Sequence, residues 1–271
     1  MAFMARKTKR RQLLQNNRYC IYCGGVEKST TWDHMPNKGM FPKDRPGGLE
    51  FPSCEACNQG SKWFEDIVSF IGSIRFDDSS DSATEHFDKK LAHLTKTQPE
   101  VIEELRPTRR QLRQAESALH DGGALNLQGE IASSALSLYG AKLAIALHWR
   151  KTQQILPKNA QIAVYCISNE RLFDNSVPPH LFELLPDGEE LRQGKNRSKY
   201  PFFFASGKAE DTSATVHWAT FGQAIAYNLF VGGNLDLTSV PARQLFFPGC
   251  LQTVKPKPRL QSIPWPNRLT F

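Results

Sequence analysis

Two closely spaced pairs of cysteines constrain the fold of this chain more than any other feature of its sequence. Cys20 and Cys23 form the first pair, Cys54 and Cys57 form the second, and two residues separate the cysteines of each pair. In a reducing compartment such pairs are typical of tetrahedral zinc ligation, because each turn directs two thiolates into one volume. The sequence therefore predicts a structural zinc ion held by all four thiolates, with residues 24–53 folded between the two pairs.

A redox-active dithiol is the alternative for a Cys-x-x-Cys pair. Two separate pairs and the lack of a surrounding βαβ pattern argue against it. The other two cysteines, Cys166 and Cys250, stand alone in apolar surroundings. We expect both to be buried core thiols rather than nucleophiles.

Length and composition indicate an ordinary folded protein. The chain has 271 residues, of which 40% are hydrophobic and 23% charged. This is enough material for one large domain or two small ones of roughly 100–200 residues each. No run of about 18 to 20 consecutive apolar residues is present, and the N-terminus lacks the apolar run of a secretory signal. We therefore expect a cytoplasmic protein without a membrane partner.

The formal charge of +7 and the pI near 9.1 allow a polyanionic partner, because clustered basic residues displace counterions from phosphates. Through residue 45, ten Lys and Arg face only three acidic residues. The densest basic run precedes the first cysteine pair and consists of Arg6, Lys7, Lys9, Arg10 and Arg11. A nucleic-acid-binding arm and a solvated, disordered tail both fit this composition.

The segment between the cysteine pairs carries the chemistry. The β-branched and aromatic run that begins at Thr30 predicts a strand, and Pro36 ends it just after Asp33 and His34. Because neighbouring side chains on a strand point to opposite faces, Asp33 and His34 should diverge. A loop rich in Gly, Pro and Lys follows from residue 37 to residue 48. Apolar positions after Cys57 then predict a helix that begins at Asn58.

Together, these residues resemble the HNH nucleases, the zinc-bound branch of the ββα-metal family. The resemblance covers about fifty residues and leaves the rest of the chain unexplained. It is closest to bacterial members that read Asp-His-x-Pro-x-Lys-Gly-x-Phe-Pro, matched here from Asp33 to Pro42. The other matching positions are the two cysteine pairs and Asn58, directly after the last cysteine.

The resemblance implies a role for each matching residue. His34 would be the general base that takes a proton from the attacking water. Asp33 and Asn58 would bind a catalytic divalent ion, Mg²⁺ or Mn²⁺, while the four cysteines hold the structural zinc. Oxygen ligands suit a hard cation that keeps several waters. An imidazole near its ordinary pKa of about 6.5 can accept a proton at neutral pH.

Two positions depart from the family pattern. Many HNH nucleases carry a middle Asn, which mainly braces the loop that bears the catalytic His, yet residues 46–53 contain no Asn. Asn37 or a backbone group could take its place. The second departure is Asn58, where many members have His; an amide oxygen favours a hard metal over nickel or zinc.

Further side chains near the motif are weaker candidates. Lys38, Lys43, Arg45 and Lys62 could contact phosphates of a nucleic acid, although loop charges are usually just solvated. Glu65 and Asp66 lie two helical turns beyond Asn58 and could brace the metal site; an exposed acidic patch on a helix is the alternative.

The sequence predicts an α+β protein in which a small ββα-metal module precedes a helical and α+β C-terminal region. The expected parts are a basic arm (1–18), the zinc module (19–76), a helical connector (77–125) and a region of unknown role (126–271). In the connector, Pro99 and Pro107 interrupt helical patterns between residues 84 and 120. Beyond it we expect a long helix, residues 125–148, followed by strands at residues 161–168, 200–205, 214–220 and 224–231.

Two functions of different classes follow. The first is a metal-dependent endonuclease that hydrolyses phosphodiester bonds of nucleic acid, with DNA as the expected substrate, although the motif itself does not distinguish DNA from RNA. The second is a non-catalytic, zinc-bound protein that binds nucleic acid or a partner. The presence of Asp33, His34 and Asn58 favours the first, and the missing middle Asn favours the second.

Overall fold

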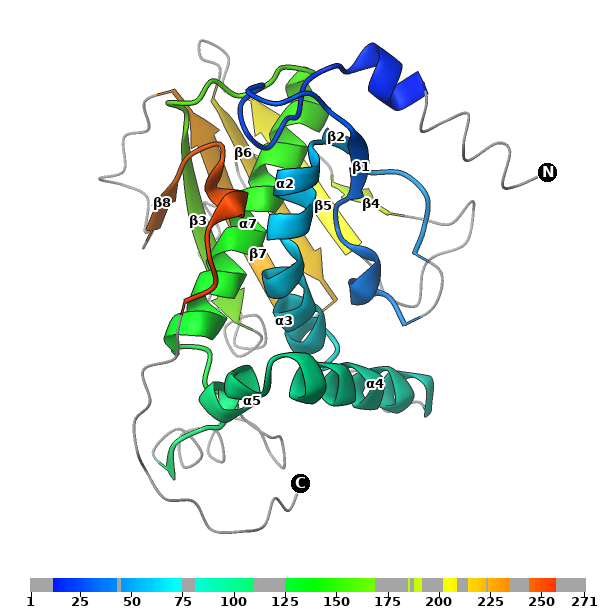
Figure 1. Ribbon diagram of the computed structural model, residues 1–271, viewed down its shortest axis with the longest axis vertical. Helices are drawn as coiled ribbons and strands as arrows, with labels where there is room; N and C mark the ends of the chain where they lie inside the picture. The colour runs from blue at the N-terminus through cyan, green and yellow to red at the C-terminus, as the bar shows by residue number, and fades with distance from the viewer. Residues whose placement is uncertain are drawn as a thin grey trace, which may run out of the picture.

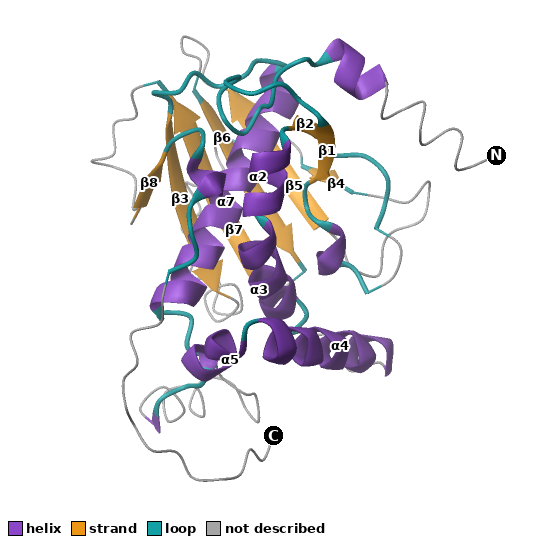
Figure 2. Cartoon of the chain, in the orientation of Figure 1, coloured by secondary structure: helices purple, strands orange, loops and turns teal. Residues whose placement is uncertain are grey.

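The fold places one long helix between an antiparallel sheet and a small N-terminal module that contains the cysteine pairs (Figure 1). The computed structural model describes residues 12–42, 45–74, 81–109, 125–168, 185, 188–191, 202–208, 214–222, 224–233 and 244–256. The predicted α+β class is confirmed, because helices and a separate antiparallel sheet make up these residues (Figure 2).

The N-terminal module consists of a two-stranded antiparallel sheet followed by two short helices. Strand β1 (Thr31–His34) pairs with β2 (Glu50–Ser53), and a 3-10 turn, η1 (Lys38–Met40), lies in the loop between them. The chain then forms α2 (Glu55–Gly60) and α3 (Lys62–Gly72). Pro52 fits within β2 because this sheet has only two strands, both of them edges.

The first helix of the module starts earlier than the sequence predicts. Cys54 is its N-cap, and its sulfur accepts a hydrogen bond from the Cys57 N–H. The helix therefore includes Asn58 instead of beginning there, and Ser61 separates it from α3. The apolar positions that suggested a single helix belong mainly to α3, whose buried residues include Phe64, Ile67 and Val68.

Two helices, α4 (Asp81–Thr97) and α5 (Pro99–Leu105), lie in the predicted connector. Pro99 is the first residue of α5, where a missing N–H costs nothing. The long helix α7 (Glu130–Thr152) follows and is shifted a few residues beyond its predicted range. Its length and composition would suffice to cross a membrane, but 83% of that apolar stretch is buried inside the protein, as in a core helix.

The C-terminal region forms a six-stranded antiparallel sheet in the order β4-β5-β6-β7-β3-β8. Four strands are those the sequence predicts, within two or three residues at their ends. The sequence did not indicate the two short strands at the sheet edges. The strands are β3 (Gln161–Ser168), β4 (Glu189–Glu190), β5 (Phe202–Lys208), β6 (Thr215–Phe221), β7 (Ile225–Gly232) and β8 (Gln244–Phe246).

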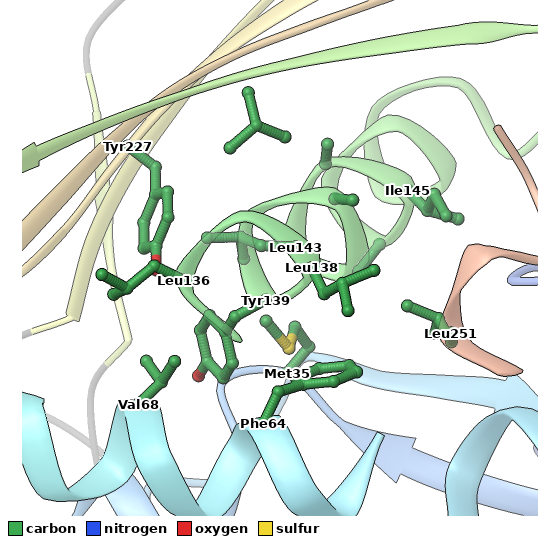
Figure 3. Packing of buried hydrophobic residues seen from close by; sticks show 14 of the residues in the cluster. Met35, Phe64, Val68, Leu136, Leu138, Tyr139, Leu143, Ile145, Tyr227 and Leu251 are labelled. Carbon is green, nitrogen blue, oxygen red and sulfur yellow. The ribbon is translucent and has the colours of Figure 1, made fainter. Parts of the chain in front are cut away.

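The core is continuous from the cysteine module to the sheet. Helix α7 is buried against both the sheet and the module. Tyr227 of the sheet stacks near Tyr139, and the Tyr139 side chain also points toward Phe64 and Val68 of α3 in the module (Figure 3). A Cβ on Gly140 would lie 2.4 Å from Val164, so glycine permits the close approach of α7 to β3. The predicted module and C-terminal region therefore share one hydrophobic core.

The end of the chain returns to the module. The turn η2 (Cys250–Gln252) lies against α2, and the N–H of Gly249 donates to the Tyr22 carbonyl at 2.8 Å. A Cβ on Gly60 would lie 2.4 Å from the carbonyl oxygen of Leu251. The two backbones thus meet where only glycine fits.

We expect Gly60→Ala to lower the free energy of unfolding by about 1–3 kcal/mol, although alanine is the better helix former. The methyl group would force η2 away from α2. Urea unfolding measures the change. Gly47→Ala is the matched control, since nothing lies within 4 Å of a Cβ there. Equal stability of the two variants would contradict close docking of η2.

Two buried histidines join α7 to the sheet. His148 Nδ1 and His217 Nε2 each lie 2.9 Å from the Thr215 hydroxyl, and His217 Nδ1 lies 2.8 Å from the Ser206 hydroxyl. Burial, helped by nearby Lys208, lowers the pKa of His148 to about 4, and burial lowers the pKa of His217 to about 3. Both imidazoles are therefore neutral in the folded protein at neutral pH.

Acid should destabilise the protein through these two histidines. In the unfolded chain they take up protons below the ordinary pKa of 6.5, whereas in the folded protein they resist protonation down to their lowered pKa values. The neutral histidines therefore make their full contribution to the free energy of unfolding above pH 6.5, and this contribution decreases toward pH 4. Between about pH 7 and pH 5 the free energy of unfolding falls by about 2 kcal/mol per histidine. Urea unfolding of wild type and of His148→Gln/His217→Gln checks this. A variant with the wild-type pH dependence would contradict it.

Candidate metal centre and adjacent polar site

The four paired cysteines meet at the base of the β1-β2 sheet. Their sulfur atoms all lie within 4.8 Å of one another, and all four residues are buried. The first pair sits in a tight turn whose Gly24 and Gly25 have φ angles of +68° and +75°, which side chains rarely tolerate. The second pair spans the cap and first turn of α2.

Hydrogen bonds to sulfur surround the cluster. The Glu27 N–H donates to Cys23 Sγ at 3.4 Å, and the Gln252 side-chain amide donates to Cys57 Sγ at 3.5 Å. The hydrogen bond from the Cys57 thiol lowers the pKa of Cys20 to about 5, whereas this contact and burial raise the pKa of Cys57. The thiolate form, which binds metals, is thus favoured at Cys20, whereas burial raises the pKa of Cys23 to about 11.

This cluster could hold a metal ion such as zinc. Four thiolates at a Zn–S distance of about 2.3 Å would stand about 3.8 Å apart in a tetrahedron, within the spread of these sulfurs. Gathering all four at one point fits metal ligation better than two independent dithiols. Cys166 and Cys250 lie outside the cluster and pack against the core, but they are half-buried rather than fully buried as predicted.

Asp33 is the buried residue of β1. Only 5% of its surface is exposed. One carboxylate oxygen, Oδ2, accepts a hydrogen bond from the Tyr22 hydroxyl and pairs with the Lys142 ammonium, each at 2.8 Å. These contacts hold the carboxylate in one orientation. The other oxygen, Oδ1, takes no part in them.

Lys142 reaches this site from the middle of α7 and is completely buried. Its ammonium also pairs with Glu65 and donates to the Ser61 hydroxyl at 3.0 Å. Burial alone would lower the pKa of Lys142, but Asp33 and Glu65 outweigh burial and raise it. Burial raises the pKa of Glu65, against the opposing effect of Lys142. Two carboxylates therefore share one buried cation.

The two acidic residues considered on α3 differ in position. Glu65 points into the protein toward Lys142, next to the Asp33 site. Asp66 points outward, where Oδ2 lies 3.4 Å from His93 Nε2 in an exposed pair. Only Glu65 lies where it could brace the site.

Asn58 lies beside the same face of β1. Its side-chain Nδ2 donates to the Thr31 hydroxyl at 3.1 Å, and Thr31 lies two residues before Asp33 on the strand. Alternate strand residues share a face, so Asn58 and Asp33 are placed on one side of β1. The amide oxygen of Asn58 is not used in this bond.

His34 projects from the opposite face of β1, as the sequence predicts. Its ring packs edge-on to Trp32, with centroids 5.3 Å apart, and Glu50 is its partner across the strands. Burial, then the charges of Arg45 and Lys38, lower the pKa of His34 to about 4. The imidazole is therefore neutral, and able to accept a proton, at neutral pH.

Arg45 braces the loop that follows His34. Its guanidinium donates to four backbone carbonyls, those of Pro36, Pro46, Gly48 and Leu49, at 2.6–3.3 Å. These bonds connect the two ends of the β1-β2 loop, the task that the resemblance gives to the absent middle Asn. The Arg45 guanidinium, predicted to contact phosphate, is thus engaged with the chain itself.

The remaining predicted positions separate into three groups. The Asn37 side-chain N–H donates a hydrogen bond to the Ser69 hydroxyl at 3.0 Å, and its amide oxygen accepts one from the Tyr139 hydroxyl at 3.1 Å. Asn37 therefore helps to hold the loop, the role that we considered for it in place of the middle Asn. Lys38 and Lys62 are exposed and free to meet a polyanion. Lys43 and the basic run at residues 6–11 lie outside the described residues.

Sequence reasoning missed Tyr22 and Lys142. Tyr22 lies between the two cysteines of the first pair and gives no distinct signal. Lys142 does give one: it interrupts the apolar segment Leu138–Leu147 in a helix that is buried all round. A lysine in such a position needs a buried anion.

Comparison of the chain with protein-family models, curated proteins and solved structures gave no match.

Proposed function

We propose that this protein is a metal-dependent nuclease of the HNH type that hydrolyses phosphodiester bonds of nucleic acid, with DNA as the expected substrate. One observation carries the proposal: the side chains of Asp33 and Asn58 are each anchored through one atom on the same side of β1. Each therefore keeps an oxygen that is not used in these bonds. Such anchoring fixes the ligands of a metal site.

The donor set suits a hard divalent cation. A carboxylate oxygen from Asp33 and an amide oxygen from Asn58 are ligands that Mg²⁺ or Mn²⁺ accepts, and two protein ligands leave room for water and phosphate. When bound, the ion would stabilise negative charge on the phosphate and on the leaving oxygen. Lys142 and Tyr22 would keep the Asp33 carboxylate oriented meanwhile.

His34 would act as the general base. Its imidazole is neutral at neutral pH and follows Asp33 along β1 on the opposite face of the strand, with Arg45 bracing the adjacent loop. It would take a proton from a water that attacks the phosphorus. The four cysteines would fix the hairpin and α2 relative to each other through zinc.

Plasmid nicking with Mg²⁺ or Mn²⁺ tests the proposal. Wild type should nick, and His34→Ala should lose activity by about 100-fold or more, as expected for a general base. His93→Ala, which removes an exposed histidine, is the matched control and should keep activity. Zinc content should be unchanged in both variants. Nicking that survives His34→Ala would reject the mechanism.

A non-catalytic zinc-bound nucleic-acid-binding protein is the second candidate. The contact of Lys142 with Asp33 favours it, because a buried ammonium already compensates that carboxylate. In that case wild type would bind oligonucleotides without cutting them under any divalent ion.

A further inference from the structure

A cavity of about 450 Å³ opens between the N-terminal module and the sheet. Its walls come from β2, from the last turn of α7 with the residues just after it, and from β4 and β5. In Figure 1 these elements lie beside the upper end of α7. We propose that this cavity binds a single unpaired nucleotide of the substrate, next to the phosphate that is cut. The inference rests on the proposed nuclease function and adds the substrate class.

The position of the cavity follows from the strand register. Glu50 lines the cavity and is the direct partner of His34 across the β1-β2 pair. Directly opposed residues in antiparallel strands have Cα atoms about 5 Å apart. A nucleotide in the cavity is therefore within one step along a nucleic-acid backbone of a phosphate at His34.

The walls have the chemistry of a nucleobase site. Phe51 and Phe204 are buried in the wall of the cavity, whereas Trp149 is only half-buried and supplies aromatic surface on which a base can stack. The Arg150 guanidinium lies over the Phe204 ring, 5.4 Å from its centroid, and presents a flat cationic surface. Glu50 can accept hydrogen bonds from an exocyclic amino group of a base.

Two basic residues, Arg150 and Lys151, line the cavity together with the acidic Glu50 and Glu189, and a basic side chain can bind a phosphate. Lys151 is exposed at the end of α7, and Arg150 is partly exposed with a surface ion pair to Glu189 at 2.6 Å. Both cations lie beside the aromatic wall, so one nucleotide could place its base inside and its phosphate outside. A cavity of this size suits a small ligand, whereas the bases of an intact duplex are stacked on one another and cannot enter it.

Substrate preference follows from this geometry. Single strands, and duplexes that contain an unpaired nucleotide, should bind more tightly than a perfect duplex. The gain should be about tenfold, which corresponds to one base stacked on aromatic side chains.

Fluorescence anisotropy with His34→Ala protein tests the inference without cleavage. The probes are a labelled single strand, its perfect duplex and the same duplex with one unpaired nucleotide. Arg150→Ala/Lys151→Ala should weaken binding of the first and third probes about tenfold, the loss expected for two phosphate contacts, and leave the perfect duplex less affected. Lys96→Ala, an exposed lysine on α4, is the matched control.

Three outcomes would overturn the inference: equal affinity for all probes, equal losses for all probes in the double variant, or binding of a free mononucleotide as tight as that of the single strand. The last would indicate a mononucleotide site. Each of these is distinguishable from failure of the nuclease proposal, which is judged by nicking in wild type and its loss in His34→Ala.

Discussion

Replacing Lys142 by methionine should lower the free energy of unfolding by about 3–5 kcal/mol. The ammonium is completely buried and compensates Asp33 and Glu65, while it also donates to the Ser61 hydroxyl. Methionine has a similar shape but no charge, so two buried carboxylates would lose their shared partner. Urea unfolding at neutral pH measures the loss, and nicking activity should fall with it because Asp33 loses an anchor.

The matched control for this change is Lys96→Met. Lys96 is exposed on α4, away from the site, so its loss should change stability by less than about 0.5 kcal/mol. A second variant, Lys142→Met/Glu65→Gln, removes one of the two buried charges and should recover part of the stability. If the urea midpoint of Lys142→Met equals that of wild type, the prediction is wrong and the buried ion cluster does not contribute to stability.

Local sequence patterns predicted the parts of the site that lie close together along the chain. Two cysteine pairs predicted one four-thiol cluster, and alternation on a strand predicted that Asp33 and His34 face opposite sides. Apolar and β-branched runs gave four of the six strands of the main sheet. These features depend on the spacing of neighbouring residues, which is visible without a fold.

The contacts that complete the site could not be predicted in this way. Lys142 reaches Asp33 from a helix far along the chain, and Gln252 reaches Cys57 from still farther. No periodicity specifies which distant element covers which face. The start of α2 was also misplaced, because the cap comes from the sulfur of Cys54 rather than from a residue type that usually caps helices.

Loss of the four-cysteine site is expected to have the largest effect of all. Cys57→Ser should abolish zinc binding and unfold the module, because zinc contributes about 10–16 kcal/mol to the folding of small zinc modules at neutral pH. The fully buried Cys57 joins α2 to the first cysteine turn and also accepts the Gln252 amide. Zinc per chain, measured by mass spectrometry, should fall from about one to near zero, and proteases should cut within residues 20–60.

Cys166→Ser is the matched control, since Cys166 lies on β3 outside the cluster and should leave zinc content unchanged. The comparison also tests how far the module supports the rest of the fold. Helix α7 packs between the module and the sheet, so loss of the module would expose one side of a helix that is apolar all round. We therefore expect Cys57→Ser to aggregate or to bind a hydrophobic dye, whereas Cys166→Ser should do neither. A soluble Cys57→Ser protein with full zinc content would show that the four thiols do not form one metal site.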